Sequence, residues 1–186
     1  MDFRELKKLT IGGVDLVQLF INGVQVFKSG YKNWVKYSTE ADGVTIYNGG
    51  LGYKNGYRIR SGGGEGTQAR GTCTGFIPVQ GGDVIRISGF DFSYASNGNA
   101  INVSDSSFTN LGQFTMLPAA YGILATGEAY VAYSVKSVVE ETTGVWKWVV
   151  PPAASGVAYI RVSGQNESGT YPGANLIVTV NEEITA

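Results

Sequence analysis

An aromatic-rich segment near the start of the chain carries the residue types best suited to binding a ligand. Between residues 31 and 60, tyrosine, tryptophan and arginine side chains lie among many glycines and asparagines. Aromatic rings present flat apolar surfaces and their polar neighbours can hydrogen-bond, a combination that sugar-binding sites commonly use. The candidate ligand-binding residues are Trp34, Tyr37, Tyr53, Tyr57 and Arg58, accompanied by Tyr47 and Arg60. The alternative is that these rings fill core or interface volume.

Catalytic chemistry has few candidates. The chain has no histidine, which excludes Ser-His-Asp and Cys-His mechanisms and imidazole metal sites. The single cysteine, Cys73, excludes an internal disulfide and is expected to be a small packed apolar residue. The glycine-rich run 61–66 lacks the Lys-Ser/Thr ending of a phosphate-binding loop and is expected to be a mobile surface loop. The acidic residues follow no calcium-loop or paired-carboxylate spacing, so we expect no catalytic residue, metal or cofactor, with a glycan-cleaving enzyme as the weakest alternative.

Composition and charge narrow the class of protein further. The 186 residues include 27 glycines and 11 tyrosines, which favours many strands joined by tight turns. With 14 basic and 15 acidic residues the net charge is −1, so no general field attracts nucleic acid. No run approaches the roughly 18 consecutive apolar residues of a spanning helix, and no membrane insertion is expected.

The segment 16–28 predicts a β-hairpin. Two β-rich runs flank Asn22-Gly23, the strongest short signal for a two-residue turn. Pairing Ile21 with Val24 would set Leu19 opposite Val26 and Phe20 opposite Gln25. One face would then hold Val17, Leu19, Ile21, Val24 and Val26, and the other Phe20 and Phe27. Because an isolated hairpin is marginal in water, both apolar faces are expected to bind a partner or the protein's own main domain.

The remainder of the chain predicts an all-β domain. Strands are expected around 44–47, 57–60, 75–79, 84–88, 101–104, 129–135, 145–150, 157–163 and 176–180. Such a series suits a jelly-roll-like two-sheet sandwich, so the chain divides into an N-terminal hairpin arm, residues 1–30, and a sandwich, residues 31–186. Residues 108–127 predict no firm structure.

Alternation within two strands predicts which residues form the core. Trp146 and Trp148 share one strand face with Val150, an arrangement typical of core packing. In 158–163, Ile160 and Val162 are expected to face the core, whereas Arg161 and its alternate neighbours are expected to face water.

Several runs resemble structural proteins of phages and prophages of Gram-positive gut bacteria. They are residues 21–26, 30–33, 47–49, 52–58 and 74–87, together with 158–163 and 175–183 near the end. The resemblance covers most of the chain but not 108–144. Its motifs are turn-and-strand patterns, and similar modules are carbohydrate-binding-like β-sandwiches in tail fibres, baseplates and head appendages.

The resemblance implies a non-enzymatic accessory protein of the virion, made in the bacterial host cytoplasm. Its partners would be other virion proteins and further copies of the same chain, trimers being common among such proteins. Both a tail or baseplate component and a head decoration remain open. The alternative is a receptor module that binds glycans of the host surface.

Overall fold

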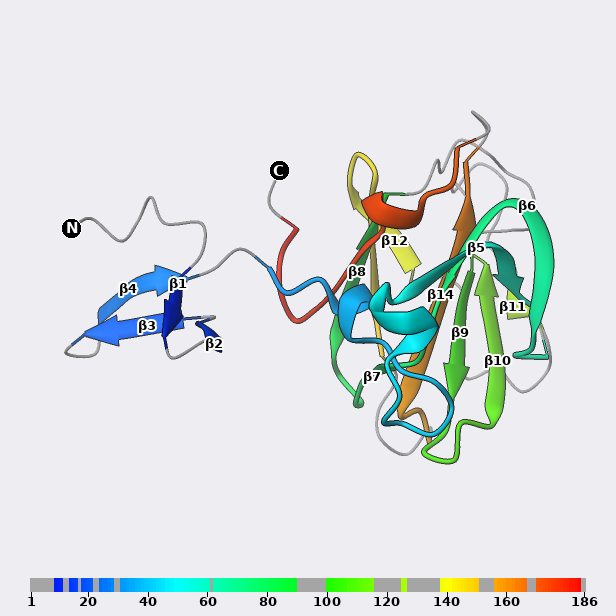
Figure 1. Ribbon diagram of the computed structural model, residues 1–186, viewed down its shortest axis with the longest axis horizontal. Coiled ribbons are helices and arrows are strands. Elements are labelled where there is room, and N and C mark those ends of the chain that lie inside the picture. The colour runs from blue at the N-terminus through cyan, green and yellow to red at the C-terminus, as the bar shows by residue number, and fades with distance from the viewer. Residues whose placement is uncertain are drawn as a thin grey trace.

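The computed structural model describes residues 31–60, 62–89, 100–115, 125–126, 138–150, 156–166 and 170–184, and the backbone of 9–11, 14–16, 18–21 and 24–28. These residues form β-strands joined by loops and short 3-10 turns (Figure 1). Three of the turns matter below: η2 (Trp34–Tyr37), η3 (Tyr47–Gly50) and η8 (Gly173–Asn175).

Two antiparallel sheets make up the main body. The larger, seven-stranded sheet has the order β11-β10-β9-β14-β6-β5, with β7 also paired to β14. Its strands are β5 (Tyr53–Ile59), β6 (Glu65–Thr74), β7 (Ile77–Pro78), β9 (Ala100–Ser104), β10 (Asn110–Thr115), β11 (Ala125–Thr126) and β14 (Tyr159–Gln165). The four-stranded sheet has the order β12-β13-β8-β15, from β8 (Val84–Ser88), β12 (Val138–Thr142), β13 (Val145–Val149) and β15 (Ile177–Val180). The predicted all-β, two-sheet sandwich is confirmed.

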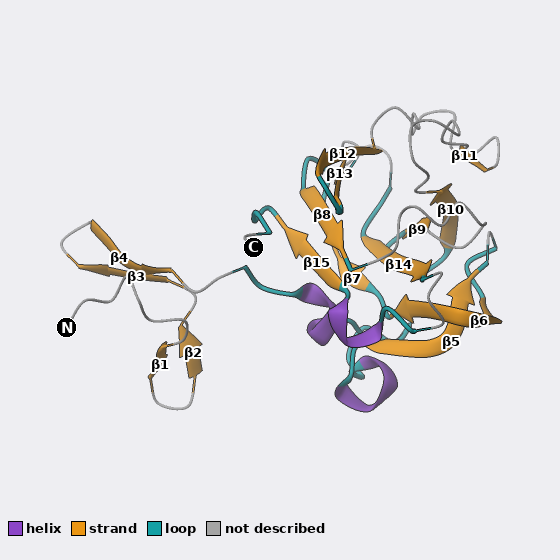
Figure 2. Ribbon diagram, turned by 90° about the horizontal axis from the view of Figure 1, so that it is seen from above, coloured by secondary structure: helices purple, strands orange, loops and turns teal. Residues whose placement is uncertain are grey.

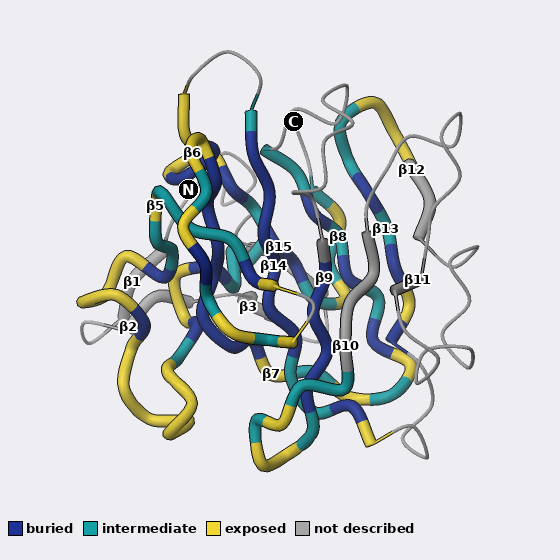
Figure 3. The backbone as a smooth tube through the Cα atoms, turned by 90° about the vertical axis from the view of Figure 1, so that its right-hand side faces the viewer, coloured by how far each residue is buried: buried dark blue, intermediate teal, exposed yellow. Residues whose placement is uncertain are grey.

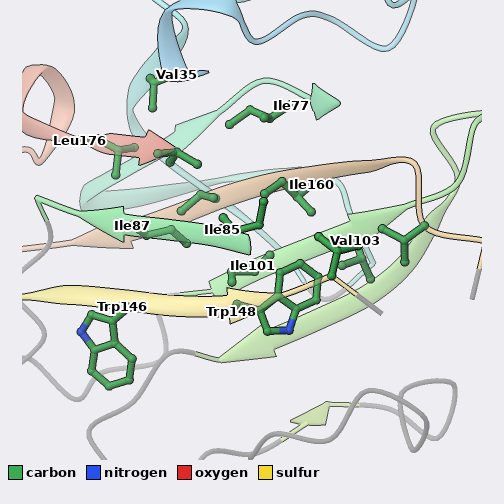
Figure 4. Close-up of a cluster of buried hydrophobic side chains, with 14 residues drawn as sticks. Val35, Ile77, Ile85, Ile87, Ile101, Val103, Trp146, Trp148, Ile160 and Leu176 are labelled. Atoms are coloured by element: carbon green, nitrogen blue, oxygen red, sulfur yellow. The ribbon is translucent and has the colours of Figure 1, made fainter. Parts of the chain in front are cut away.

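The hydrophobic core lies between these sheets (Figure 4). Alternate residues of each strand point inward, because successive side chains of a strand face opposite sides. Trp146 and Trp148 are 3% and 0% exposed, so their predicted core position is confirmed. The buried cluster is completed by Val35, Ile77, Ile85, Ile87, Ile101, Val103, Val150, Val157, Ile160, Val162, Leu176 and Val178.

One predicted strand is wrong, and the sequence does not predict the strands β1, β2, β6, β10, β11 and β12. Residues 44–47 form no strand: Ile46 makes only an isolated bridge to Thr39, and the chain then turns through left-handed Asn48 and Gly49. Val44 and Ile46 are 82% and 42% exposed, so only Tyr47 of this segment gains the burial that would hold a strand. The prediction at 129–135 lies outside the described residues.

The longest strand that the sequence does not predict is β6, and the loop expected at 61–66 overlaps it. Glu65 and Gly66 belong to this strand, so the loop prediction is wrong for them. The strand pairs with β5 on one side and β14 on the other, and its ladder with β5 shifts register between Asn55 and Tyr57. Because backbone hydrogen bonds hold β6 from both sides, it needs no alternating apolar pattern.

The sequence predicts that the outer face of β14 is exposed to water, but the structure shows it buried. Arg161, Ser163 and Gln165 are buried along with Ile160 and Val162, and Figure 3 marks the strand as buried along nearly its whole length. The chain folds over this face: the Arg161 guanidinium lies 4.9 Å from the ring centre of Phe76 and 5.3 Å from that of Tyr47. The alternation of the sequence therefore marks two buried faces of different polarity.

Two small hairpins precede the sandwich and lie to one side of it in Figures 1 and 2. One pairs β1 (Leu9–Ile11) with β2 (Val14–Leu16), and the other pairs β3 (Gln18–Ile21) with β4 (Val24–Lys28). The predicted pairs Ile21–Val24 and Phe20–Gln25 are confirmed. The ladder then shifts register, so Leu19 is opposite Phe27 and not opposite Val26 as predicted. A bulge in β4 causes this change, because it leaves one residue of that strand without a cross-strand partner. Val17 lies outside the described residues.

Candidate functional site

The turn η2 presents three different sides. Since a 3-10 turn has about three residues per turn, side chains three positions apart lie above each other. Trp34 and Tyr37 therefore share one side, with ring centres 6.2 Å apart and nearly edge to face. Asn33 and Lys36 share the second side, and Val35 enters the core on the third.

A lysine covers the aromatic side of η2. The Lys32 ammonium lies 3.5 Å from the ring centre of Trp34 and 4.2 Å from that of Tyr37, within cation–π range. Burial lowers the pKa of Lys32, while the carboxylate of Glu182 opposes that shift. Tyr37 nevertheless remains 51% exposed, so part of its ring can still contact a ligand.

The second side of η2 borders a pocket of about 310 Å³. Its lining comes from η2, η3, the start of β5 and η8, segments far apart in sequence. The lining residues are Asn33, Val35, Lys36, Gly50, Leu51, Tyr53, Gly173, Ala174 and Leu176. Val35 and Leu176 are almost fully buried and Leu51 is 55% exposed, so the pocket runs from the edge of the core to solvent.

Side-chain hydrogen bonds hold the pocket's irregular walls in place. Asn33 caps η2 by accepting from the Val35 N–H, accepts a second bond from the Val178 N–H and donates to the Leu176 carbonyl. It thereby ties η2 to the smaller sheet. On the opposite wall, Thr72 donates to Asn55 and accepts from the Gly173 N–H, which ties η8 to the larger sheet.

Two glycines allow the close approaches that shape the pocket. Gly52 has φ +75°, and a Cβ added there would lie 1.7 Å from the Val35 carbonyl oxygen. Gly173 has φ +33°, and a Cβ there would lie 3.2 Å from the Tyr53 ring. A larger residue at either position would push one wall of the pocket away from the other.

The structure separates the predicted ligand-binding residues into groups. Tyr53 lines the pocket, whereas Trp34 and Tyr37 form the aromatic side of η2. Tyr57 and Arg58 lie on β5 beyond its register shift and do not line the pocket. The Lys54 ammonium lies 3.8 Å from the ring centre of Tyr57.

A buried polar network lies over the outer face of β14, and sequence reasoning missed it. Glu65 accepts hydrogen bonds from the Tyr47 hydroxyl, from Arg161 at 2.7 Å and from the Lys54 ammonium at 3.0 Å. Arg161 also donates to the Thr74 carbonyl at 2.9 Å. Burial works to raise the pKa of Glu65, but the three donated bonds outweigh it and hold this pKa below its ordinary value. No local pattern marks Glu65, because its partners come from distant segments.

Cys73 belongs to the same buried layer. Its sulfur lies 3.6 Å from the Tyr47 hydroxyl, and burial is the main reason that the pKa of its thiol is raised. A protonated, enclosed thiol is a poor nucleophile. The prediction that Cys73 is a packed residue is confirmed, since it is fully buried.

The described part of the chain holds neither a metal-binding cluster nor a membrane-spanning helix. No cluster there brings together three or more Cys, Asp or Glu side chains as a metal would require. Nor does any helix among those residues have the length and apolar character needed to cross a membrane.

Comparisons with known proteins give no identity. No family model, no curated protein and no solved structure matches the chain.

Proposed function

We propose that the protein is a non-enzymatic structural protein of a bacteriophage virion, attached by its β3–β4 hairpin and displaying the β-sandwich outward. The observation that carries the proposal is that β1–β4 form two small sheets of their own and, among the described strands, pair with none of the sandwich. Two-stranded hairpins are marginally stable alone, so docking on a neighbouring chain would stabilise them. The virion as the site of assembly rests on the resemblance of the sequence.

The observed register makes the β3–β4 hairpin amphipathic. Leu19–Phe27 and Ile21–Val24 are apolar pairs, and they alternate with Gln18–Lys28 and Phe20–Gln25. Alternate cross-strand pairs belong to the same face of a ladder, so the two apolar pairs share one face, and Phe20 shares the other face with the two glutamines and the lysine. One face therefore suits docking, on another virion protein or on a further copy of the chain.

The carboxylates enclosed by the sandwich favour a structural role over a catalytic one. In Glu65 both oxygens accept hydrogen bonds. In the buried Asp83, one oxygen accepts from the Gln80 N–H and the other from Asn181. Hydrogen bonds within the protein thus hold both carboxylates, as expected of groups that position neighbouring segments.

A double variant that introduces two negative charges into the apolar face tests the attachment. The double variant Leu19→Asp with Phe27→Asp places like charges on opposite positions of the apolar face, which opposes both pairing and docking. We expect loss of the protein from purified particles by immunoblot, with an unchanged melting temperature of the sandwich. The matched control is Gln18→Asp with Gln25→Asp, which adds the same charge to the other face and should be incorporated normally. Normal incorporation of the Leu19/Phe27 variant would move attachment elsewhere.

A second candidate, a receptor module for host-surface glycans, is favoured by the half-exposed ring of Tyr37 beside Trp34. Sugar rings stack on such exposed aromatic surfaces. Glycan-array binding that is lost in Tyr37→Ala would support it. The matched control is Tyr171→Ala, because Tyr171 is 47% exposed but lies outside η2. Equal loss in both variants, or no binding at all, would remove this candidate.

A further inference from the structure

We propose that the pocket between η2, η3 and η8 binds a small organic monoanion with an apolar body, such as an aromatic or branched aliphatic carboxylate. This site is separate from the attachment hairpin and from the aromatic side of η2. Its volume of about 310 Å³ lies at the lower end of the range for small-molecule sites.

The inner part of the pocket suits an apolar group. Val35 and Leu176 are 2% and 1% exposed and belong to the hydrophobic core (Figure 4). Tyr53 contributes the face or edge of a ring, and Leu51 an exposed aliphatic wall. An apolar ligand group placed against these side chains would bury its own apolar surface and part of that of Leu51. Removing this surface from water favours binding.

The polar groups of the pocket are too few for a neutral sugar. Asn33 is the one amide side chain in the lining, and its oxygen already accepts from two backbone N–H groups while its nitrogen donates to the Leu176 carbonyl. A sugar ring would bring several hydroxyls against a lining whose side chains are mostly apolar, at a cost for each one left without a partner. A ligand with one polar end needs only one strong partner.

Lys36 provides that partner, and its positive charge requires a ligand with a negative polar end. The side chain is exposed on the same side of η2 as Asn33 and makes no ion pair or hydrogen bond with any described residue. Among the described residues that line the pocket, none is Asp or Glu. The lining therefore contributes one lysine whose charge no described residue pairs with, next to an apolar interior, which favours a monoanion over a cation or a neutral ligand.

The pocket walls are fixed before any ligand arrives. Asn33 links η2 to β15, Thr72 links η8 to β5 and β6, and Ser38 donates to the Gly52 carbonyl at 2.8 Å. Because these bonds order the walls in the free protein, little conformational entropy is lost on binding. A small ligand with few contacts can then bind measurably.

Phenylacetate, its neutral isostere phenylacetamide, acetate and glucuronate are the probes for this pocket, added to the full chain and followed by amide NMR shifts. We expect phenylacetate to shift the amides of Gly50 and Ala174 and to bind about two- to fivefold more tightly than phenylacetamide, the range for an exposed ion pair. Lys36→Gln should abolish that difference. The control Lys147→Gln removes a lysine that pairs with Glu141 elsewhere and should leave it intact.

A second experiment blocks the pocket. Ala174 is exposed and lines the pocket, so Ala174→Phe can fill the mouth without entering the core, whereas Ala174→Ser leaves it open. We expect the first variant to lose phenylacetate binding and the second to keep it, with both incorporated into particles normally. Absence of shifts at pocket amides, equal binding of phenylacetate and phenylacetamide, or tighter binding of glucuronate would each overturn the assignment.

Discussion

At the scale of single residues, Glu65 joins segments that are far apart in the chain, and nothing in its local sequence indicates this role. It links the end of the β5–β6 turn to Tyr47, which precedes the larger sheet in the chain, and to Arg161 in the middle of β14. Arg161 is only 6% exposed, and a buried guanidinium is costly unless it is paired. Glu65 therefore compensates a charge that the fold encloses.

Replacing Glu65 should make stability less dependent on pH. Because folding lowers the pKa of this carboxyl, its contribution to stability is present above the unfolded value of about 4.3 and is lost as the pH falls through the folded value. We expect Glu65→Gln to lower the free energy of unfolding by about 2 kcal/mol at pH 7, a typical value for hydrogen bonds to a charged group. The difference from the original protein should shrink below about pH 4 in urea unfolding curves.

Glu141 is the matched control for this prediction. Its pKa is lowered to about 2, chiefly by the hydrogen bond from Arg86 and then by that from Lys147. Glu141 is an exposed residue, however, whereas Glu65 is half-buried and pairs with a buried arginine, and solvent screens exposed ion pairs strongly. Glu141→Gln should therefore change stability much less than Glu65→Gln, and an equal loss in the two variants would contradict the role assigned to burial.

At the scale of elements, the irregular turns are held by close backbone contacts. The end of η3 approaches η2 at Gly52, where the positive φ and the nearby Val35 carbonyl leave no room for a side chain. Ser38 closes the same contact by donating to the Gly52 carbonyl. This contact places both η2 and Tyr53 at the pocket.

Gly52→Ala should disrupt this contact. The left-handed backbone and the overlap with Val35 together predict a loss of roughly 3 kcal/mol or more in unfolding free energy. Gly56→Ala is the control: Gly56 has φ +81°, but a Cβ there would meet no atom within 4 Å. It should cost about 1 kcal/mol, from backbone strain alone. Equal losses in chemical denaturation would show that the contact with Val35 is unimportant.

At the scale of the whole molecule, the sandwich contains its own stabilising contacts. Among the residues whose burial is described, the buried hydrophobic cluster runs from Val35 to Val178. The first described residues after the hairpins are tied back to the end of the chain, as the Lys32 N–H donates to Glu182 and Asn33 bonds to both Leu176 and Val178.

A fragment of residues 31–186 should therefore fold without the hairpins. We expect its β-type circular dichroism to persist and its melting temperature to fall by less than about 3 °C, which for this size corresponds to about 1 kcal/mol. Aggregation of the fragment, or loss of its β signal, would mean that β1–β4 are part of the folded core.

The sequence alone determined the features that depend on neighbouring residues. Strict alternation in 145–150 placed Trp146 and Trp148 in the core, and Asn22-Gly23 set the pairing of Ile21 with Val24, because side-chain period and turn geometry are local properties. The all-β class followed from the same patterns, repeated along the chain.

Only the tertiary structure decided the rest. The strand β6 is held by its neighbours on both sides, the outer face of β14 is covered by distant segments, and a bulge brings Phe27 opposite Leu19. The pocket joins residues 33–53 to 173–176, and its shape depends on approaches such as that of Gly173 to the Tyr53 ring. These features arise from contacts between parts of the chain that are far apart in sequence, where periodicity and turn signals carry no information.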